Sequence, residues 1–240
     1  MKHKEDKGKS NHITIIEAEF NRKALHYESN RLANWYQAQG EQILHQITSL
    51  DGAVIDVGCG TGWLLRRLIK QNPYATCIGI DLSKQMIEQA KIKMHVERLN
   101  NVSFIHGDWE DAAIIEKVRD RLDQPVSKIV CVSSFHYFRH PEIAVRSMHD
   151  LLAPNGSLFL LDRAMDGSIG TFTWDFLHRY LIKDQVRFYK TSELVSLLEK
   201  TGFENVRVLK KINRWLWKQK LYTSLALVSG IRGVTPVEAS

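Results

Sequence analysis

The 240-residue sequence has no stretch of about 18 to 20 uninterrupted apolar residues, which a membrane-spanning helix needs. Its first ten residues, Met1 to Ser10, are polar and charged where a secretory signal peptide needs an apolar core. The three cysteines, Cys59, Cys77 and Cys131, stand far apart and lack the paired spacing of zinc or redox motifs. We therefore expect a cytoplasmic protein with no transmembrane segment, no metal site and buried, reduced thiols.

Acidic residues are missing from one segment near the C-terminus. It contains six basic residues, as many as the formal net charge of +6: Arg207, Lys210, Lys211, Arg214, Lys218 and Lys220. A solvated basic edge is one interpretation. A docking surface for an acidic partner, such as a phosphorylated carrier, an anionic lipid surface or RNA, is the other.

The hydrophobic content of 44% is enough for one sizeable core. Residues 1–12 are polar and lysine-rich, which predicts a flexible arm. The remainder, 13–240, is expected to be a single domain with its core at 50–163 and 191–230. Residues 13–48 and 164–190 are expected to cap that core.

Short apolar runs alternate with helical patterns through the middle of the chain, and they predict five strands: 53–57, 76–81, 102–106, 128–133 and 157–162. Because these strands are apolar on both faces, they favour a parallel sheet covered by helices on each side. A helix at 192–200 and strands at 206–209 and 221–228 follow. The prediction is an α/β, Rossmann-like fold with a seven-stranded, mostly parallel sheet, N-terminal helices and a lid-like insertion after strand five.

A glycine-rich turn follows the first predicted strand, in the sequence VIDVGCGTG. Gly58, Gly60 and Gly62 allow a sharp turn and close approach of a ligand to the backbone at the start of a helix, where free N–H groups favour an anion. Asp56 adds a carboxylate that could meet a cationic amine. The spacing G-x-G-x-G differs from the G-x-G-x-x-G of dinucleotide folds, which disfavours a nicotinamide-dependent oxidoreductase.

Two more acids follow the next two strands. Asp81 ends the second strand, where its carboxylate can accept hydrogen bonds from both hydroxyls of a ribose. Asp108 follows the third strand, placed to accept from an adenine amine, and Trp109 beside it offers an aromatic face. Because ligands of open parallel sheets bind at the carboxyl ends of strands, these acids and the glycine turn predict an adenosyl site.

These motifs, together with the fourth-strand segment CVSSFHYF and the turn LLAPNGSLFLLD, closely resemble those of class I S-adenosylmethionine-dependent methyltransferases. The resemblance covers roughly residues 43–228. It implies methyl transfer from S-adenosylmethionine to a small-molecule or acyl-carrier-bound acceptor. The cofactor-binding residues that it implies are Asp56, Gly58, Gly60, Gly62, Asp81, Leu82, Asp108, Trp109 and Ser133.

Candidates for the acceptor side lie outside the glycine turn. His136, just past the fourth strand, is the candidate general base. The segment from Phe20 to Tyr27 is similar to the F-x-x-x-A-x-x-Y entry of methyltransferases that act on malonyl carrier protein and on quinone rings, and the resemblance places Tyr27 over the cofactor. Trp174 and His178, in the insertion, are further lid or substrate candidates.

Two other functions remain open: a non-catalytic adenosyl-binding or regulatory domain, and an RNA-directed methyltransferase that uses the basic segment. The fourth-strand segment SSFHY lacks the Asn/Asp-Pro-Pro-aromatic sequence of enzymes that methylate base amines, which argues against nucleic acid as substrate. The sequence leaves the acceptor atom and the oligomeric state undetermined.

Overall fold

The computed structural model describes residues 2–30, 33–166, 187–216 and 221–234. Its strands form a seven-stranded sheet of order β3-β2-β1-β4-β5-β7-β6, in which β7 runs antiparallel to both of its neighbours. This confirms the predicted Rossmann-like, mostly parallel fold. The chain divides into two compact units, residues 1–124 and 125–240, which are described one at a time. The single domain stays a prediction.

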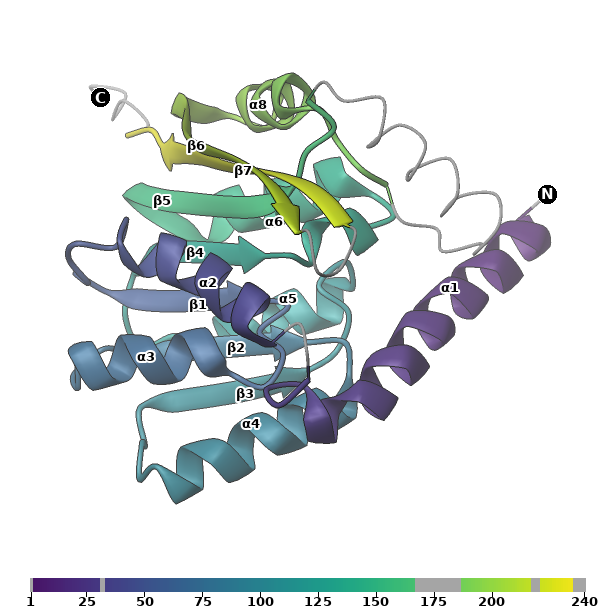
Figure 1. The fold of residues 1–240 in the computed structure, drawn as a ribbon. Coiled ribbons are helices and arrows are strands. Elements are labelled where there is room, and N and C mark those ends of the chain that lie inside the picture. The colour runs from purple at the N-terminus through teal and green to yellow at the C-terminus, as the bar shows by residue number, and fades with distance from the viewer. Residues whose placement is uncertain (1, 31–32, 167–186, 217–220, 235–240) are drawn as a thin grey trace. The chain divides into compact units, whose positions relative to one another are not determined.

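The first unit contains three parallel strands, β1 (Ala53–Val57), β2 (Cys77–Asp81) and β3 (Val102–His106). Helices α3 (Trp63–Gln71) and α4 (Lys84–Val96) lie on one face of these strands, and α5 (Ala112–Arg119) lies on the other (Figure 1). Every residue of β1 is buried. The prediction that helices cover both faces is therefore confirmed here.

Three helical elements precede β1: α1 (Lys2–Lys23), the 3-10 turn η1 (Ala24–His26) and α2 (Ala33–Leu44). The first packs against α4 and the last against α3. The predicted N-terminal helices are thus present. The backbone is helical from Lys2 onward, although we expected an arm over 1–12; the flexibility of that arm stays a prediction.

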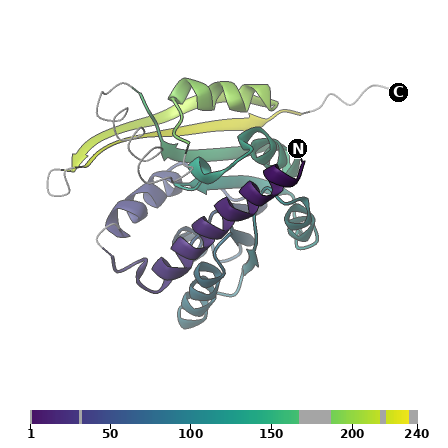
Figure 2. The same cartoon turned by 90° about the vertical axis from the view of Figure 1, so that its right-hand side faces the viewer.

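The second unit contains the parallel pair β4 (Val126–Val132) and β5 (Leu152–Arg163), joined through η2 (Phe135–Tyr137) and α6 (Pro141–Leu151). Helix α8 (Thr191–Lys200) follows and packs against the antiparallel strands β6 (Phe203–Leu216) and β7 (Leu221–Arg232). Figure 2 shows β6 and β7 as one long hairpin.

Both closing strands are longer than the predicted 206–209 and 221–228. β6 spans 14 residues and β7 spans 12, so most of the basic segment is strand. The physical reason is that β6 is an edge strand, where charged residues are tolerated while the backbone ladder continues. The last pair between β5 and β7 is Arg163 with Leu225, whereas β6 and β7 stay paired as far as Leu216 with Leu221. The hairpin therefore continues past the carboxyl end of β5.

The three cysteines are free and buried, as expected. None of the helices in the described part of the chain has the length and apolar character that crossing a bilayer requires.

Candidate functional site

The glycine turn connects β1 to α3, and its three glycines have left-handed backbones, with φ of 77° at Gly58, 54° at Gly60 and 73° at Gly62. A residue with a Cβ would be strained at each of these positions, so the local fold requires glycine. The turn is held by hydrogen bonds from the Gly58 and Cys59 N–H groups to the Ile80 carbonyl, at 2.8 and 2.9 Å. β2 thus positions the turn.

Asp81, at the end of β2, also holds the turn. Its Oδ2 accepts a hydrogen bond from the Gly60 N–H at 2.8 Å, and its Oδ1 accepts one from the Ser83 N–H at 2.8 Å. Burial raises the pKa of Asp81 to about 6, although the hydrogen bonds from Ser83 and Gly60 oppose this shift. Each carboxylate oxygen keeps capacity to accept a further donor such as a hydroxyl.

Asp56 lies in β1 next to the glycine turn and is only 3% exposed. Burial, and then the negative charge of Asp81, raise its pKa to about 8. At neutral pH its carboxyl group is therefore mostly protonated in this structure. A positively charged ligand group beside it would restore ionisation, because an opposite charge favours the carboxylate.

The remaining cofactor candidates of the first unit follow β2 and β3. These strand ends are neighbours, since Asp81 pairs with His106 in the parallel register. Asp108 is half-buried, and its Oδ1 accepts from the Glu110 N–H at 3.0 Å. Trp109 is buried, and Leu82 is half-buried. The structure thus brings the expected acids to one edge of the three strands, while Trp109 packs into the core rather than presenting an open face.

Tyr27 follows η1, and its ring carbon Cε1 lies 3.8 Å from where a Cβ on Gly60 would stand. The ring stacks on Tyr36 of α2, with centroids 5.3 Å apart. The N-terminal segment therefore brings an aromatic ring to the glycine turn, and the expected place of Tyr27 over the cofactor stays a prediction. The other lid candidates, Trp174 and His178, lie outside the described residues.

The donor set at this edge suits an adenosyl cofactor with a cationic, zwitterionic tail. Asp81 has acceptor capacity for ribose hydroxyls, Asp56 is a buried acid whose ionisation needs a cation, and the start of α3 offers N–H groups to a carboxylate. A diphosphate would meet the carboxyl groups of the buried Asp56 and the half-buried Asp81 here. Among the described residues, no basic side chain hydrogen-bonds to either of them. The residues present fit S-adenosylmethionine better than a dinucleotide.

In the second unit, His136 of η2 is paired with Asp162 of β5. The His136 Nδ1 lies 2.7 Å from Asp162 Oδ1, and the His136 N–H donates to Asp162 Oδ2 at 3.0 Å. Burial alone would raise the pKa of Asp162, but the charge and hydrogen bonds of His136, with the Arg163 N–H, lower it below its usual range. An ionised Asp162 fixes the imidazole with Nδ1 as donor, so Nε2 is the nitrogen that can take a proton.

Asp162 was missed as a site residue in the sequence, although it ends the predicted fifth strand. Its partner lies 26 residues earlier, and only the parallel register of β4 and β5 brings the two ends together. Ser133, the remaining cofactor candidate, follows β4 with a left-handed φ of 52° and donates its N–H to the Leu161 carbonyl at 2.8 Å.

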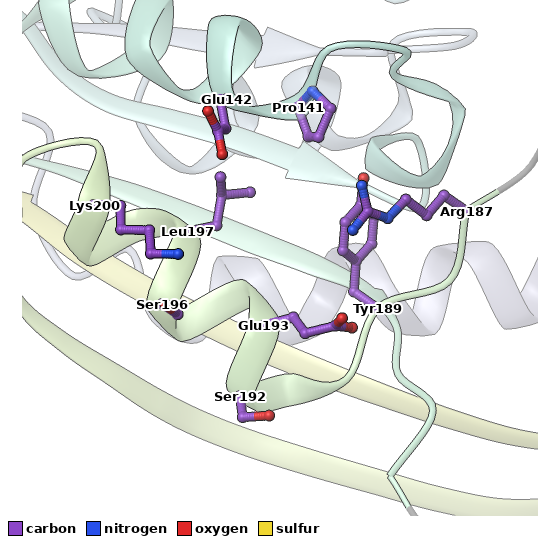
Figure 3. Close-up of a pocket in the computed structure, with 9 residues that line it drawn as sticks. All are labelled: Pro141, Glu142, Arg187, Tyr189, Ser192, Glu193, Ser196, Leu197 and Lys200. Atoms are coloured by element: carbon purple, nitrogen blue, oxygen red, sulfur yellow. The ribbon is translucent and has the colours of Figure 1, made fainter.

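A cavity of about 300 Å³ lies in the second unit between the start of α6 and α8 (Figure 3). Its lining includes Pro141, Glu142 and Lys200, and Arg187 stacked on the Tyr189 ring at 4.9 Å. The Arg187 N–H also donates to the His136 carbonyl at 3.0 Å, which ties one wall of the cavity to the His136 segment. Of the expected site residues that the structure describes, none lines it.

Comparison with known proteins agrees with this geometry. A family model described as a methyltransferase domain matches residues 24–208. The chain belongs to this methyltransferase family. Membership confirms the resemblance to the S-adenosylmethionine-dependent methyltransferase family.

Three relatives show what the chain is similar to. It is 37% identical over 107 residues to the malonyl-[acyl-carrier protein] O-methyltransferase of Halalkalibacterium halodurans, which covers 44% of this chain and 37% of that protein. It is 26% identical over 209 residues to a ubiquinone biosynthesis O-methyltransferase of Coxiella burnetii, covering 79% and 85%. The match to another malonyl-[acyl-carrier protein] O-methyltransferase, from Priestia megaterium, covers 54% of that protein. The chain thus spans about half or less of these malonyl-carrier relatives.

Among solved structures, the methyltransferase resembles magnesium protoporphyrin IX methyltransferase from Synechocystis, whose structure holds S-adenosylhomocysteine. The TM-score is 0.64 at 15% identity, covering 92% of this chain and 99% of that one. It also resembles a [4+2]-cyclase, with a TM-score of 0.61 at 14% identity, covering 82% and 80%. These likenesses show the fold, and the cyclase illustrates that activity must be argued from the site.

Proposed function

We propose that the protein is an S-adenosylmethionine-dependent O-methyltransferase whose acceptor is a hydroxyl group. The observation that carries this proposal is the buried pair of His136 and Asp162, with 2.7 Å between Nδ1 and Oδ1. A base oriented by a carboxylate is what a hydroxyl acceptor requires. Phenol-like hydroxyls have a pKa near 10 and need to lose a proton as they react.

The residues of the first unit would hold the cofactor. Asp81 would accept from the ribose hydroxyls, Asp108 from the adenine amine, and Asp56 would ionise beside the cationic amino group. The glycine turn would admit the tail close to the backbone. When bound, S-adenosylmethionine supplies a methyl group activated by a positively charged sulfur, so the protein's tasks are alignment and exclusion of water.

His136 would act on the acceptor. Its Nε2 would take the proton of the acceptor hydroxyl, and the resulting oxygen nucleophile would receive the methyl group that S-adenosylmethionine supplies when bound. The ionised Asp162 stabilises the imidazolium that forms and keeps the ring in the required tautomer. Asp162 is a positioning residue in this scheme, because it acts through His136.

A test compares acceptors of two kinds at saturating S-adenosylmethionine: dihydroxylated aromatic rings and carboxylic acids. We expect O-methyl ethers from the hydroxyl acceptors, and a loss of turnover in His136→Gln with cofactor affinity kept within about twofold. Methylation restricted to carboxylates, with His136→Gln as active as wild type, would refute the proposal.

A second candidate is methylation of a carboxylate carried on an acyl-carrier protein. The observation that favours it is the β6–β7 hairpin, which has no Asp or Glu from Arg207 to Arg232 and exposes Arg207 and Lys210. The names of the malonyl-carrier relatives point the same way. A carboxylate is already ionised at neutral pH, so this reaction would not need the base.

Charge-neutralising variants of the hairpin separate the two candidates. For a carrier partner, the triple variant Lys210→Gln, Lys211→Gln and Arg214→Gln raises KM for the carrier-bound substrate about tenfold and leaves a free acceptor unaffected. A loss of two positive charges elsewhere, Lys117→Gln with Arg119→Gln on α5, provides the control. Unchanged carrier affinity in the hairpin variant would remove this candidate.

A further inference from the structure

We propose that Glu28 is a positioning residue for cofactor binding, which fastens the N-terminal segment to both sides of Gly62 and so holds Tyr27 over the glycine turn. This inference rests on the cofactor site of the proposed function. We call the three residues Glu28, Thr61 and Arg66 the latch. All three belong to the first unit.

The contacts of Glu28 are short, and they divide between its two oxygens. Oε1 accepts a hydrogen bond from the Thr61 hydroxyl at 2.5 Å, and Oε2 accepts one from Arg66 Nη2 at 2.7 Å. Lys93 Nζ lies 3.4 Å from the same Oε2. One carboxylate therefore binds a residue inside the glycine turn, a residue of α3 and a residue of α4.

The electrostatics make this carboxylate a stable anion. Burial alone would raise the pKa of Glu28, but the hydrogen bonds from Arg66 and Thr61, and the charges of Arg66 and Lys93, lower it below its usual value. Thr61 is 2% exposed and Arg66 is 6% exposed. Buried, hydrogen-bonded charge pairs of this kind lose little to solvent screening, and breaking one partner is strongly unfavourable.

The latch joins the last part of the glycine turn to the first turn of α3. Thr61 precedes Gly62, the left-handed residue before α3, and the Arg66 N–H makes the hydrogen bond to the Gly62 carbonyl at 3.0 Å that begins the helix. Glu28 thus spans Gly62 from both sides. Glu28, 33 positions before Thr61, therefore holds the start of α3 in place. The N–H groups of this helix start would face the cofactor tail.

Tyr27 is the neighbour of Glu28 in the chain and lies next to the latch. Its ring faces Gly60 and stacks on Tyr36. Because adjacent residues cannot move independently, releasing Glu28 from Thr61 and Arg66 frees the ring to leave the turn. A cofactor seated on the turn would then escape more readily, so the latch should act mainly on the dissociation rate.

Arg66 offers an internal control. Its Nε also lies 3.2 Å from Glu97 Oε1, and Glu97 pairs with Lys70 at 2.7 Å. Glu97 lies just past α4, where it pairs with Arg66 and Lys70 of α3. Glu97→Gln therefore removes an ion pair of the same kind, on the same arginine, without opening the latch.

The experiment measures S-adenosylhomocysteine affinity by calorimetry and its dissociation rate by stopped-flow tryptophan fluorescence. We expect Glu28→Gln to raise both Kd and the dissociation rate about tenfold, with kcat at saturating cofactor within about twofold of wild type. Glu97→Gln, compared at a similar loss of thermal stability, should stay within about twofold in Kd. Adding Thr61→Val to Glu28→Gln should weaken binding little further, because the two substitutions disrupt the same contact between Glu28 and Thr61.

Hydrogen exchange of residues 24–29 tests the latch without any ligand. Exchange should quicken in Glu28→Gln and remain at the wild-type rate in Glu97→Gln. Equal exchange, or equal affinity, in the two variants would overturn the latch. A failure of the proposed function gives a different result, because wild-type protein would then bind neither S-adenosylmethionine nor S-adenosylhomocysteine. The proposed role of Glu28 in cofactor binding would then be refuted, even if exchange of residues 24–29 were faster in Glu28→Gln.

Discussion

Aspartates at strand ends have opposite pKa shifts in the two units. In the first unit, burial raises the pKa of Asp56 to about 8 and that of Asp81 to about 6. In the second unit, burial is outweighed by His136, and the pKa of Asp162 is lowered. Among the described residues of the first unit, no strong cationic partner offsets the burial of Asp56 and Asp81. In the second unit His136 is the partner that favours the charged form of Asp162. The difference fits the two roles proposed above, binding of a cationic ligand in the first unit and proton transfer in the second.

The largest expected effect concerns the pair of His136 and Asp162. Asp162→Asn should lower kcat by roughly 10² to 10³-fold, because the imidazole loses its fixed tautomer and the stabilisation of its protonated form. Steady-state kinetics with a hydroxyl acceptor measure this loss. S-Adenosylhomocysteine affinity, determined in parallel, should change less than about threefold. An equal loss of affinity would mean that the two units do not divide the work in this way.

The next effect concerns the first unit. Asp81→Ala should weaken S-adenosylmethionine binding by roughly 1 to 3 kcal/mol, through lost charge-assisted hydrogen bonds to ribose and a loosened Gly60 N–H. Calorimetric titration gives the value directly. Asp120→Ala, at the end of α5, removes an exposed carboxylate and serves as control. Wild-type affinity in Asp81→Ala would show the ribose assignment to be wrong.

Proton release should accompany cofactor binding. At pH 7 Asp56 is mostly protonated, because its pKa is about 8, and a cationic amino group beside it lowers that pKa. We expect release of nearly one proton per cofactor at pH 7, falling towards zero well above pH 8. Calorimetry in buffers of different ionisation enthalpy counts these protons. In Asp56→Asn the release should disappear; its persistence would assign the proton to another group.

The smallest effect is a pair of stability changes with opposite signs. The raised pKa of Asp56 means that its contribution is complete below the unfolded value near 3.9 and is lost as pH rises through about 8, so Asp56→Asn should raise the melting temperature most at pH 9. The lowered pKa of Asp162 contributes stability above about pH 3.9 that is lost progressively in acid, so Asp162→Asn should lower the melting temperature more at pH 7 than at pH 3. Each change should be about 2 to 4 °C per kcal/mol. Thermal unfolding at the three pH values checks both signs.

Features fixed by local chemistry were predictable from sequence. The positive φ of Gly58, Gly60 and Gly62 follows from residue type at a sharp turn. The Ser83 hydroxyl accepts from the Met86 N–H at 3.1 Å at the start of α4, as is typical of serine before a helix. The parallel strands followed from their apolar composition. Each of these depends on residues only a few positions apart.

Features that join distant residues were not predictable. The pairs of His136 with Asp162 and of Glu28 with Thr61 depend on strand register and on how the N-terminal segment packs, neither of which hydrophobic periodicity contains. The full length of β6 was not predicted for another reason. Its charged residues interrupt the apolar pattern of a strand, while its hydrogen-bond ladder with β7 stabilises it. The roles of the expected site residues stay predictions that the variants above address.

Asn21 of α1 carries a practical consequence for anyone who shortens this protein. Its Oδ1 accepts from the Ser83 hydroxyl at 2.7 Å and from the Gln85 N–H at 3.0 Å, so a residue outside the family match, which begins at 24, completes the start of α4. Ser83 in turn donates its N–H to Asp81. A chain trimmed to the matched boundary would keep Asp81 and the glycine turn but lose the hydrogen bonds of Asn21 to Ser83 and Gln85, so expression trials should begin upstream of α1's last turn.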